Sequence, residues 1–152
     1  MELSSPILRD GDAIPARYTC DADNVSPPLV WHDVPEDAES LALIVDDPDA
    51  PAKVWVHWVL YDIPPDVTWL PEGVAQEQRL PNGAVHGTND FETLGYGGPC
   101  PPGGTHRYRF TLYALDAKLN LPPGATKYEV LRAMESHVLD QQELVGRYRR
   151  ER

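Results

Sequence analysis

Three stretches of the sequence place polar side chains where an apolar run ends and the chain turns. The first is the segment DDPDAP at residues 46–51, which directly follows an apolar run. Its three carboxylates lie within four residues and repel one another, so the arrangement costs free energy unless cations or hydrogen-bond donors lie beside it. Two interpretations stay open: a functional acidic loop, or a turn in which the aspartates cap backbone amides.

The second stretch is WVHW at residues 55–58, with a histidine between two tryptophans. A strand with period two would place four side chains on one face: Trp55, His57, Val59 and Tyr61. Taken alone, such a histidine is more often a core residue than a functional one. A buried imidazole needs a hydrogen-bond partner, and a carboxylate of the acidic segment is the nearest candidate.

The third stretch is GYGGPCPPGG at residues 95–104, followed by THRY. Glycine allows close backbone approach and proline fixes φ, so such a loop can hold backbone amides toward an anion. His106 and Tyr108 are two residues apart at the start of an apparent strand and share a face. An imidazole and a phenol are suitable donors for phosphate or carboxylate. The alternative is a stiff loop before an ordinary strand.

The two cysteines, Cys20 and Cys100, are too few for a disulfide scaffold or a four-cysteine metal site. They could pair with each other, although a separation of 80 residues says nothing about their distance in the fold. We favour free thiols, because the sequence otherwise indicates a cytoplasmic protein. A free Cys100 near His57 and His106 would also allow a thiol hydrolase, provided that its pKa is lowered and an oxyanion site is present.

The elements that must position these residues are mostly strands. Apolar, β-branched and aromatic runs predict buried strands at 40–46, 54–62 and 107–115, and weaker ones near 7–8, 29–31 and 85–87. In the last long strand, alternation places Arg107 and Arg109 on one face, and Tyr108 and Phe110 on the other. Sixteen prolines spread along the chain indicate ordered loops between strands.

One segment, residues 126–146, is predicted to be helical. TKYE at 126–129 is a capping box, apolar residues follow at helical spacing through Val138 and Leu139, and Gly146 would end the helix. The basic tail at 147–152 is expected to fray. The order of elements predicts one domain over residues 1–152, an antiparallel β-sandwich with a helix packed at one edge.

Composition limits the partners. The chain has 24 acidic and 13 basic residues and a formal net charge of −11, which argues against nucleic-acid binding and adsorption to anionic lipid. No apolar run is long enough for membrane insertion, and the start of the chain lacks a signal-peptide pattern, so we expect a cytoplasmic location. Common nucleotide-binding, hydrolase and metal motifs are absent, so we expect no cofactor and no metal.

Taken in order, the motifs resemble the signature of the phosphatidylethanolamine-binding protein family, which includes the Raf kinase inhibitor proteins. The matching segments are DPDAP at 47–51 with WVH at 55–57, GPCPP at 98–102, and HRY at 106–108. Further matches extend over nearly the whole chain, most closely to the short bacterial and archaeal branch. The resemblance implies a large antiparallel sheet packed on a smaller one, together with helices.

The resemblance also implies a pocket that takes phosphate, phosphorylated head groups or carboxylates. The residues carried over as ligand-binding are Asp47, His57, Gly98, Cys100, Pro101, Pro102, His106 and Tyr108, with Asp49 and Trp55 in support. One departure is Glu92, which stands where the family pattern commonly has glycine.

The leading interpretation is therefore a non-catalytic binding or regulatory protein for a small anionic ligand. The alternative is an inhibitor that meets a partner protease or kinase through a surface loop. We also expect a homodimer, as in related short members. Trp31 and Trp69 lie beside apparent loops, where each would either complete the core or face a second subunit.

Overall fold

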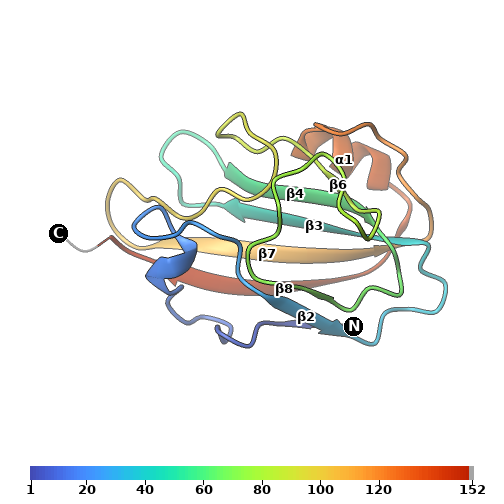
Figure 1. The fold of residues 1–152 in the computed structure, drawn as a ribbon, viewed down its shortest axis with the longest axis horizontal. Coiled ribbons are helices and arrows are strands. Elements are labelled where there is room, and N and C mark those ends of the chain that lie inside the picture. The colour runs from blue at the N-terminus through green and yellow to red at the C-terminus, as the bar shows by residue number, and fades with distance from the viewer. Residues whose placement is uncertain (151–152) are drawn as a thin grey trace.

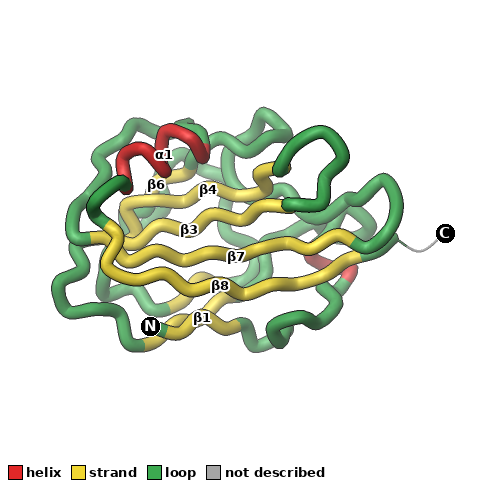
Figure 2. The backbone as a smooth tube through the Cα atoms, turned by 180° about the vertical axis from the view of Figure 1, so that it is seen from behind, coloured by secondary structure: helices red, strands yellow, loops and turns green. Residues whose placement is uncertain are grey.

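A computed structural model describes residues 1–150, and its main element is a five-stranded antiparallel sheet. The strand order is β6-β4-β3-β7-β8. In chain order the strands are β3 (Ser40–Asp47), β4 (Trp55–Ile63), β6 (Val85–His86), β7 (His106–Leu115) and β8 (Val138–Tyr148). The four long strands run side by side across the molecule (Figures 1 and 2). The central strand β3 is buried along its whole length, as its apolar run predicts.

A smaller antiparallel sheet, in the order β1-β2-β5, covers one face of the large sheet. It consists of β1 (Glu2–Ser4), β2 (Leu29–His32) and β5 (Trp69–Leu70), and a short 3-10 helix, η1 (Ala16–Tyr18), lies between β1 and β2 along the chain. Side chains of both sheets form the main core, including Leu29, Trp31 and Leu70 from the small sheet and Leu43, Trp58 and Phe110 from the large one. Burying each such side chain contributes about 1.5–3 kcal/mol.

The opposite face of the large sheet carries helix α1 (Lys127–Met134) and a second core cluster. The predicted capping box is confirmed: Thr126 Oγ1 accepts from the Glu129 amide at 3.2 Å, and the Thr126 amide donates to Glu129 Oε1 at 3.1 Å. Val130 and Met134 turn inward and pack in a cluster that contains Val59 and Tyr61 of β4. The helix thus shields the half of this face nearest β4 and β6 (Figure 2).

The prediction that the helix continues to residue 146 is wrong. Helix α1 ends at Met134, and Ser136 takes a positive φ of 67°. Residues 138–148 form β8, which pairs with β7. Pairing satisfies the backbone groups along β7 that would otherwise be exposed at a sheet edge, and this outweighs the helical spacing of Val138 and Leu139. Gly146 lies within β8 rather than at a helix end, and a Cβ there would lie 2.5 Å from Ile14 Cγ1. Of the tail expected to fray, residues 147–148 belong to β8 and 151–152 lie outside the described residues.

The three long strands are confirmed to within one residue at each end, and two weaker ones appear as β2 and β6. The predicted strand near 7–8 is wrong, since Leu8 forms only an isolated bridge with Ser5. The predicted fold class is confirmed: two antiparallel sheets and a helix near the C-terminal end of the chain. Among the described residues, no helix has the length and apolar character needed to cross a membrane.

Candidate functional site

A cavity of about 240 Å³ lies where β3 ends and β4 and β7 begin. It brings together most of the residues predicted for the site: Asp47, Trp55, His57, Cys100, Pro101, Pro102, His106 and Tyr108. Ala50, Pro51 and Phe91 complete the lining. Two predicted residues, Gly98 and Asp49, do not line it. The antiparallel order β4-β3-β7 explains the convergence, because it places the end of β3 beside the starts of both neighbours.

A β-bulge turns His57 into this cavity. In the β3–β4 ladder Val45 pairs with Trp58, whereas the next residue, Asp46, pairs with Val56, so His57 is the extra residue. The predicted common face for Trp55, His57, Val59 and Tyr61 is therefore wrong. The first two line the cavity, whereas the last two pack in the core cluster beneath α1.

His57 is buried, and its Nδ1 lies 2.6 Å from the carbonyl oxygen of Gly97. The expected carboxylate partner is thus replaced by a backbone carbonyl. A carbonyl only accepts, so Nδ1 carries the proton and Nε2 is the ring nitrogen left for a ligand. Burial lowers the pKa of His57, while the Gly97 carbonyl and the charge of Asp47 act in the opposite direction. The imidazole is therefore neutral at pH 7 in the ligand-free protein.

The second histidine takes the carboxylate instead. His106 Nδ1 lies 2.6 Å from Asp47 Oδ2, and both side chains are buried. The other carboxylate oxygen of Asp47 accepts the amide of Asp49 at 2.7 Å, so the carboxylate is fixed between its own loop and β7. This arrangement fixes the orientation of the His106 ring.

Tyr108 lies between the two histidines. Its ring is 5.2 Å from that of His57, edge to face, and 6.5 Å from that of His106, stacked. Its hydroxyl is buried and has no hydrogen-bond partner among residues 1–150. Burial, followed by the negative charge of Asp47, raises its pKa far above that of a free tyrosine, so the hydroxyl stays protonated. A buried hydroxyl without a partner costs about 1–3 kcal/mol.

The other two aspartates of the acidic segment are also paired, which removes the expected repulsion. Asp46 faces the other side of the sheet, 2.7 Å from both Arg109 Nε and Lys127 Nζ. Asp49 accepts from Arg107 Nη2 at 2.9 Å and from the Arg107 amide at 2.8 Å. The side-chain hydrogen bond from Arg107 is the main cause that lowers the pKa of Asp49 to about 2. Asp49 thus supports the cavity by clamping its loop to β7.

The expectation of free thiols is wrong, because Cys20 and Cys100 form a disulfide with Cα atoms 5.4 Å apart. The segment around η1 packs on the glycine- and proline-rich loop: the Cys20 amide donates to the Pro99 carbonyl, and the Gly98 amide to Asn24 Oδ1 at 2.8 Å. The Gly98 amide therefore does not face an anion as predicted. With both sulfurs in the disulfide, the structure contains no Cys100 thiol for the hydrolase alternative.

Phe91 is a cavity residue that sequence reasoning missed as part of the site. Its ring lies 5.3 Å from that of His57 and 5.6 Å from that of Trp55, in edge-to-face contacts. The buried Asn89 holds the Phe91 loop, since its Oδ1 accepts the amides of Phe91 and Thr93. The sequence feature that could have pointed to Phe91 was the NDF segment at 89–91. That segment matched the family pattern but did not indicate where the Phe91 ring would lie.

The described residues contain no cluster of three or more His, Cys, Asp or Glu side chains that would suit a metal ion. The polar groups of the cavity lining are instead two imidazoles, a phenol and the buried Asp47 carboxylate. Its rim is made by aromatic and proline side chains.

Comparison with known proteins places this fold and cavity in a family. The family model described as phosphatidylethanolamine-binding protein matches residues 4–149. The chain belongs to this family. Among curated members, a UPF0098 protein of Methanothermobacter thermautotrophicus is 60% identical over 150 residues, which cover 99% of each chain.

Two solved structures of phosphatidylethanolamine-binding proteins show the same fold. One, a family homolog from Chlamydia trachomatis, is 41% identical with a TM-score of 0.90 and covers 98% of this chain and 97% of its own. The other, Escherichia coli YbcL, is 33% identical with a TM-score of 0.91 and covers 99% and 98%. Membership of the phosphatidylethanolamine-binding protein family supports a non-catalytic binding protein in general.

Proposed function

We propose that the cavity beside Tyr108 binds a small oxyanion, namely phosphate, a phosphorylated head group or a carboxylate, without chemical conversion. The observation that carries this proposal is the buried Tyr108 hydroxyl, which has no partner among residues 1–150. Tyr108 lines the cavity together with His57 and His106. A ligand oxygen placed among these three groups would accept the phenolic proton and remove the cost of an unsatisfied donor.

Proton uptake should accompany binding. The pKa of His57 is lowered by burial, so its Nε2 is an acceptor at neutral pH and cannot hydrogen-bond a fully ionised oxyanion. A bound negative charge favours the imidazolium form and raises that pKa. Anion affinity should therefore increase from pH 8 to pH 6, where protonation of His57 becomes easier.

The size of the cavity sets the ligand class. At about 240 Å³ it is smaller than the roughly 300–1,000 Å³ of sites for drug-sized molecules. An oxyanion with a short substituent fits, whereas acyl chains do not. The apolar rim of Trp55, Phe91 and the prolines would contact the substituent rather than the charge.

Tyr108→Phe tests the proposal because it removes one hydroxyl and keeps the ring. We expect sulfate affinity to fall by about 1.5–3 kcal/mol, as for a hydrogen bond to a charged group. The ligand-free variant should be as stable as the parent or up to about 1 kcal/mol more stable, because an unsatisfied polar atom is removed.

The measurements are calorimetric titration with sulfate at pH 6 and pH 8, and urea unfolding. Sulfate is preferred because the second ionisation of phosphate would obscure the histidines. The matched control is Tyr113→Phe, on the same strand but on the α1 side of the sheet. Equal sulfate affinity in the parent and Tyr108→Phe would refute the proposal.

The wider role remains a prediction. A regulatory function would act through a protein partner such as a protease or kinase, and a homodimer is expected. The cytoplasmic location also stays a prediction, and the Cys20–Cys100 disulfide argues against it, because disulfides are rare in reducing compartments. Of the two tryptophans considered for assembly, Trp31 is fully buried and donates to the Val67 carbonyl at 2.8 Å. Trp69 is 57% exposed on β5, so of these two tryptophans it is the one available to a second copy.

A further inference from the structure

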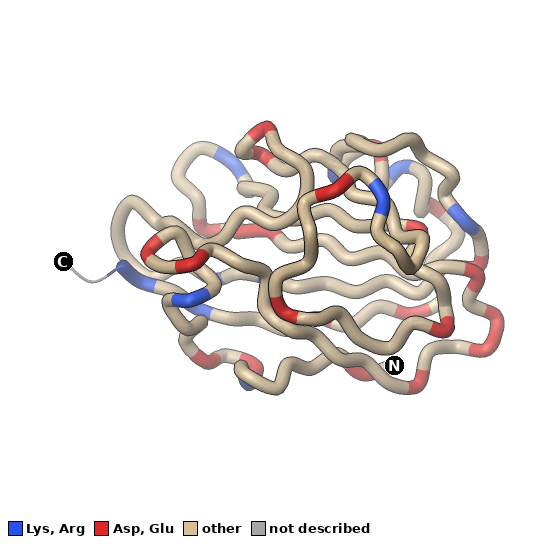
Figure 3. Tube along the Cα trace, viewed as in Figure 1, with Lys and Arg blue, Asp and Glu red and all other residues tan. Residues whose placement is uncertain are grey.

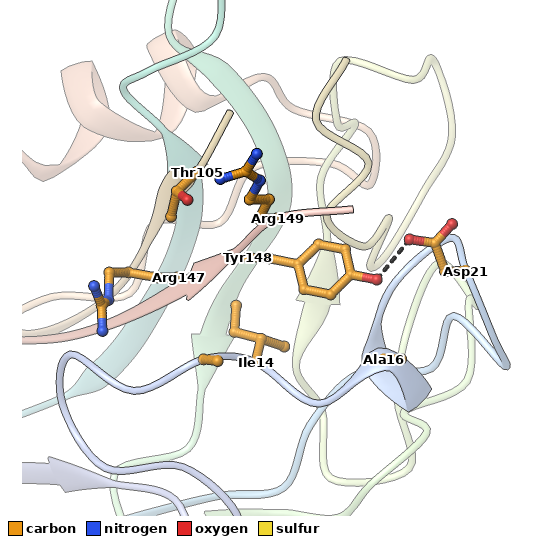
Figure 4. Close-up of a pocket in the computed structure, with 8 residues that line it drawn as sticks. Ile14, Ala16, Asp21, Thr105, Arg147, Tyr148 and Arg149 are labelled. Atoms are coloured by element: carbon orange, nitrogen blue, oxygen red, sulfur yellow. Dashed lines mark hydrogen bonds between the residues drawn. The ribbon is translucent and has the colours of Figure 1, made fainter. Parts of the chain in front are cut away.

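A second and larger cavity, of about 690 Å³, lies where the end of β8 meets the chain before η1. None of its lining residues lines the first cavity. Ile14 and Tyr148 line it on one side, and polar groups come from Arg147 of β8, from Arg149 just after β8 and from Thr105 just before β7 (Figure 4). In that view Thr105 lies beside Arg149, whereas the guanidinium of Arg147 extends in another direction from β8.

The cavity carries positive charge that the described residues do not neutralise. Arg147 uses Nε to donate to the Gly11 carbonyl at 2.6 Å, which leaves its two terminal nitrogens. Within residues 1–150, neither Arg147 nor Arg149 has a carboxylate within ion-pair distance. The one carboxylate of the lining, Asp21, accepts from the Tyr148 hydroxyl at 2.5 Å and is paired with Arg150 Nη2 at 2.9 Å.

The strand register adds to this charge. Arg147 of β8 lies directly opposite Arg107 of β7, and like charges in cross-strand positions destabilise a sheet. Arg107 is neutralised by Asp49, whereas Arg147 has no ion pair with any of residues 1–150. The chain has 24 acidic and only 13 basic residues, so unpaired neighbouring arginines are not explained by a shortage of carboxylates. Figure 3 shows acidic residues spread over many of the loops. An external anion would relieve the repulsion.

We propose that this second cavity binds an organic phosphate monoester, with the phosphate held by Arg147, Arg149 and Thr105. Two guanidinium groups match a dianion in charge and present forked donors to its oxygens. The Thr105 hydroxyl adds a neutral donor. Tyr148 and Ile14 belong to the lining of the same cavity. The site is independent of the oxyanion cavity proposed above.

The test titrates the protein with phenyl phosphate at low ionic strength. Binding is measured by calorimetry and by changes of amide chemical shifts in NMR spectra. The parent protein should show shifts at Thr105 and Tyr148 in addition to any at His57 and Gly97. In Arg147→Gln/Arg149→Gln, affinity at the second cavity should fall at least tenfold. The matched control Arg79→Gln/Arg132→Gln removes the same charge elsewhere and should change that affinity less than twofold.

Tyr108→Phe separates this inference from the proposed function. Binding at Thr105 and Tyr148 should persist in that variant even where the first cavity no longer binds. The inference is overturned if phenyl phosphate shifts only first-cavity amides, or none. Equal losses in the two double-arginine variants would also overturn it, since they would indicate long-range attraction without a site.

Discussion

The disulfide between Cys20 and Cys100 should supply a large part of the stability of this protein. Its two cysteines are 80 positions apart, so the bond closes a long loop in the unfolded chain. In the chain-entropy model, the loss of freedom on closing a loop of this length stabilises the folded state by about 4.5 kcal/mol at 25 °C. That is comparable with the whole unfolding free energy of many domains, about 5–15 kcal/mol.

The perturbation is Cys20→Ser/Cys100→Ser, which removes the cross-link. Native contacts around it should persist, because the Cys20 amide still donates to the Pro99 carbonyl and the Gly98 amide to Asn24. The double variant should therefore fold, but with an unfolding free energy lower by about 3–4.5 kcal/mol, since unfolded-state structure reduces the ideal value.

The assay is urea unfolding followed by tryptophan fluorescence and circular dichroism, with and without dithiothreitol. Reductant should lower the midpoint of the parent protein and leave the double variant unchanged, which makes the variant its own control. Thiol titration of the denatured, unreduced parent should detect no free thiol. Two free thiols, or a stability loss below about 1 kcal/mol, would refute the reasoning.

Three further predictions follow from single features. His57 and His86 both have pKa values lowered by burial from 6.5. Below that pH the unfolded chain binds more protons than the native one. Urea unfolding should therefore show stability falling from pH 7 to pH 5, by up to about 1.4 kcal/mol per pH unit for each histidine, and a flat profile would contradict this assignment. Glu92 has a φ of 64°, so Glu92→Gly should raise the free energy of unfolding by about 0.5–1 kcal/mol, whereas Glu36→Gly, outside that region, should not. For the predicted homodimer, sedimentation equilibrium at micromolar concentration should show a species of twice the 17.0 kDa chain mass, and Trp69→Ala should lower the affinity between the two copies. A single species at the chain mass would exclude the homodimer.

The sequence alone determined those elements whose signals are local. The strands β3, β4 and β7 follow from apolar runs of strand length, and the start of α1 follows from a capping box contained in four residues. The convergence of DPDAP, WVH and HRY could be anticipated only through the family resemblance. Local pattern placed these motifs near strand ends but did not order the strands.

The tertiary structure decided the features that depend on a distant partner. Residues 138–148 have helical spacing yet become β8, because the edge of β7 offers backbone hydrogen bonds that a helix would leave unused. The bulge that turns His57 into the cavity exists only in the pairing of β3 with β4. Cys20 and Cys100 meet because η1 packs against the loop before β7, a contact that no local pattern encodes. The proposed function rests on the Tyr108 hydroxyl, which has no hydrogen-bond partner within the described part of the chain. Its burial likewise results from segments far apart in the sequence.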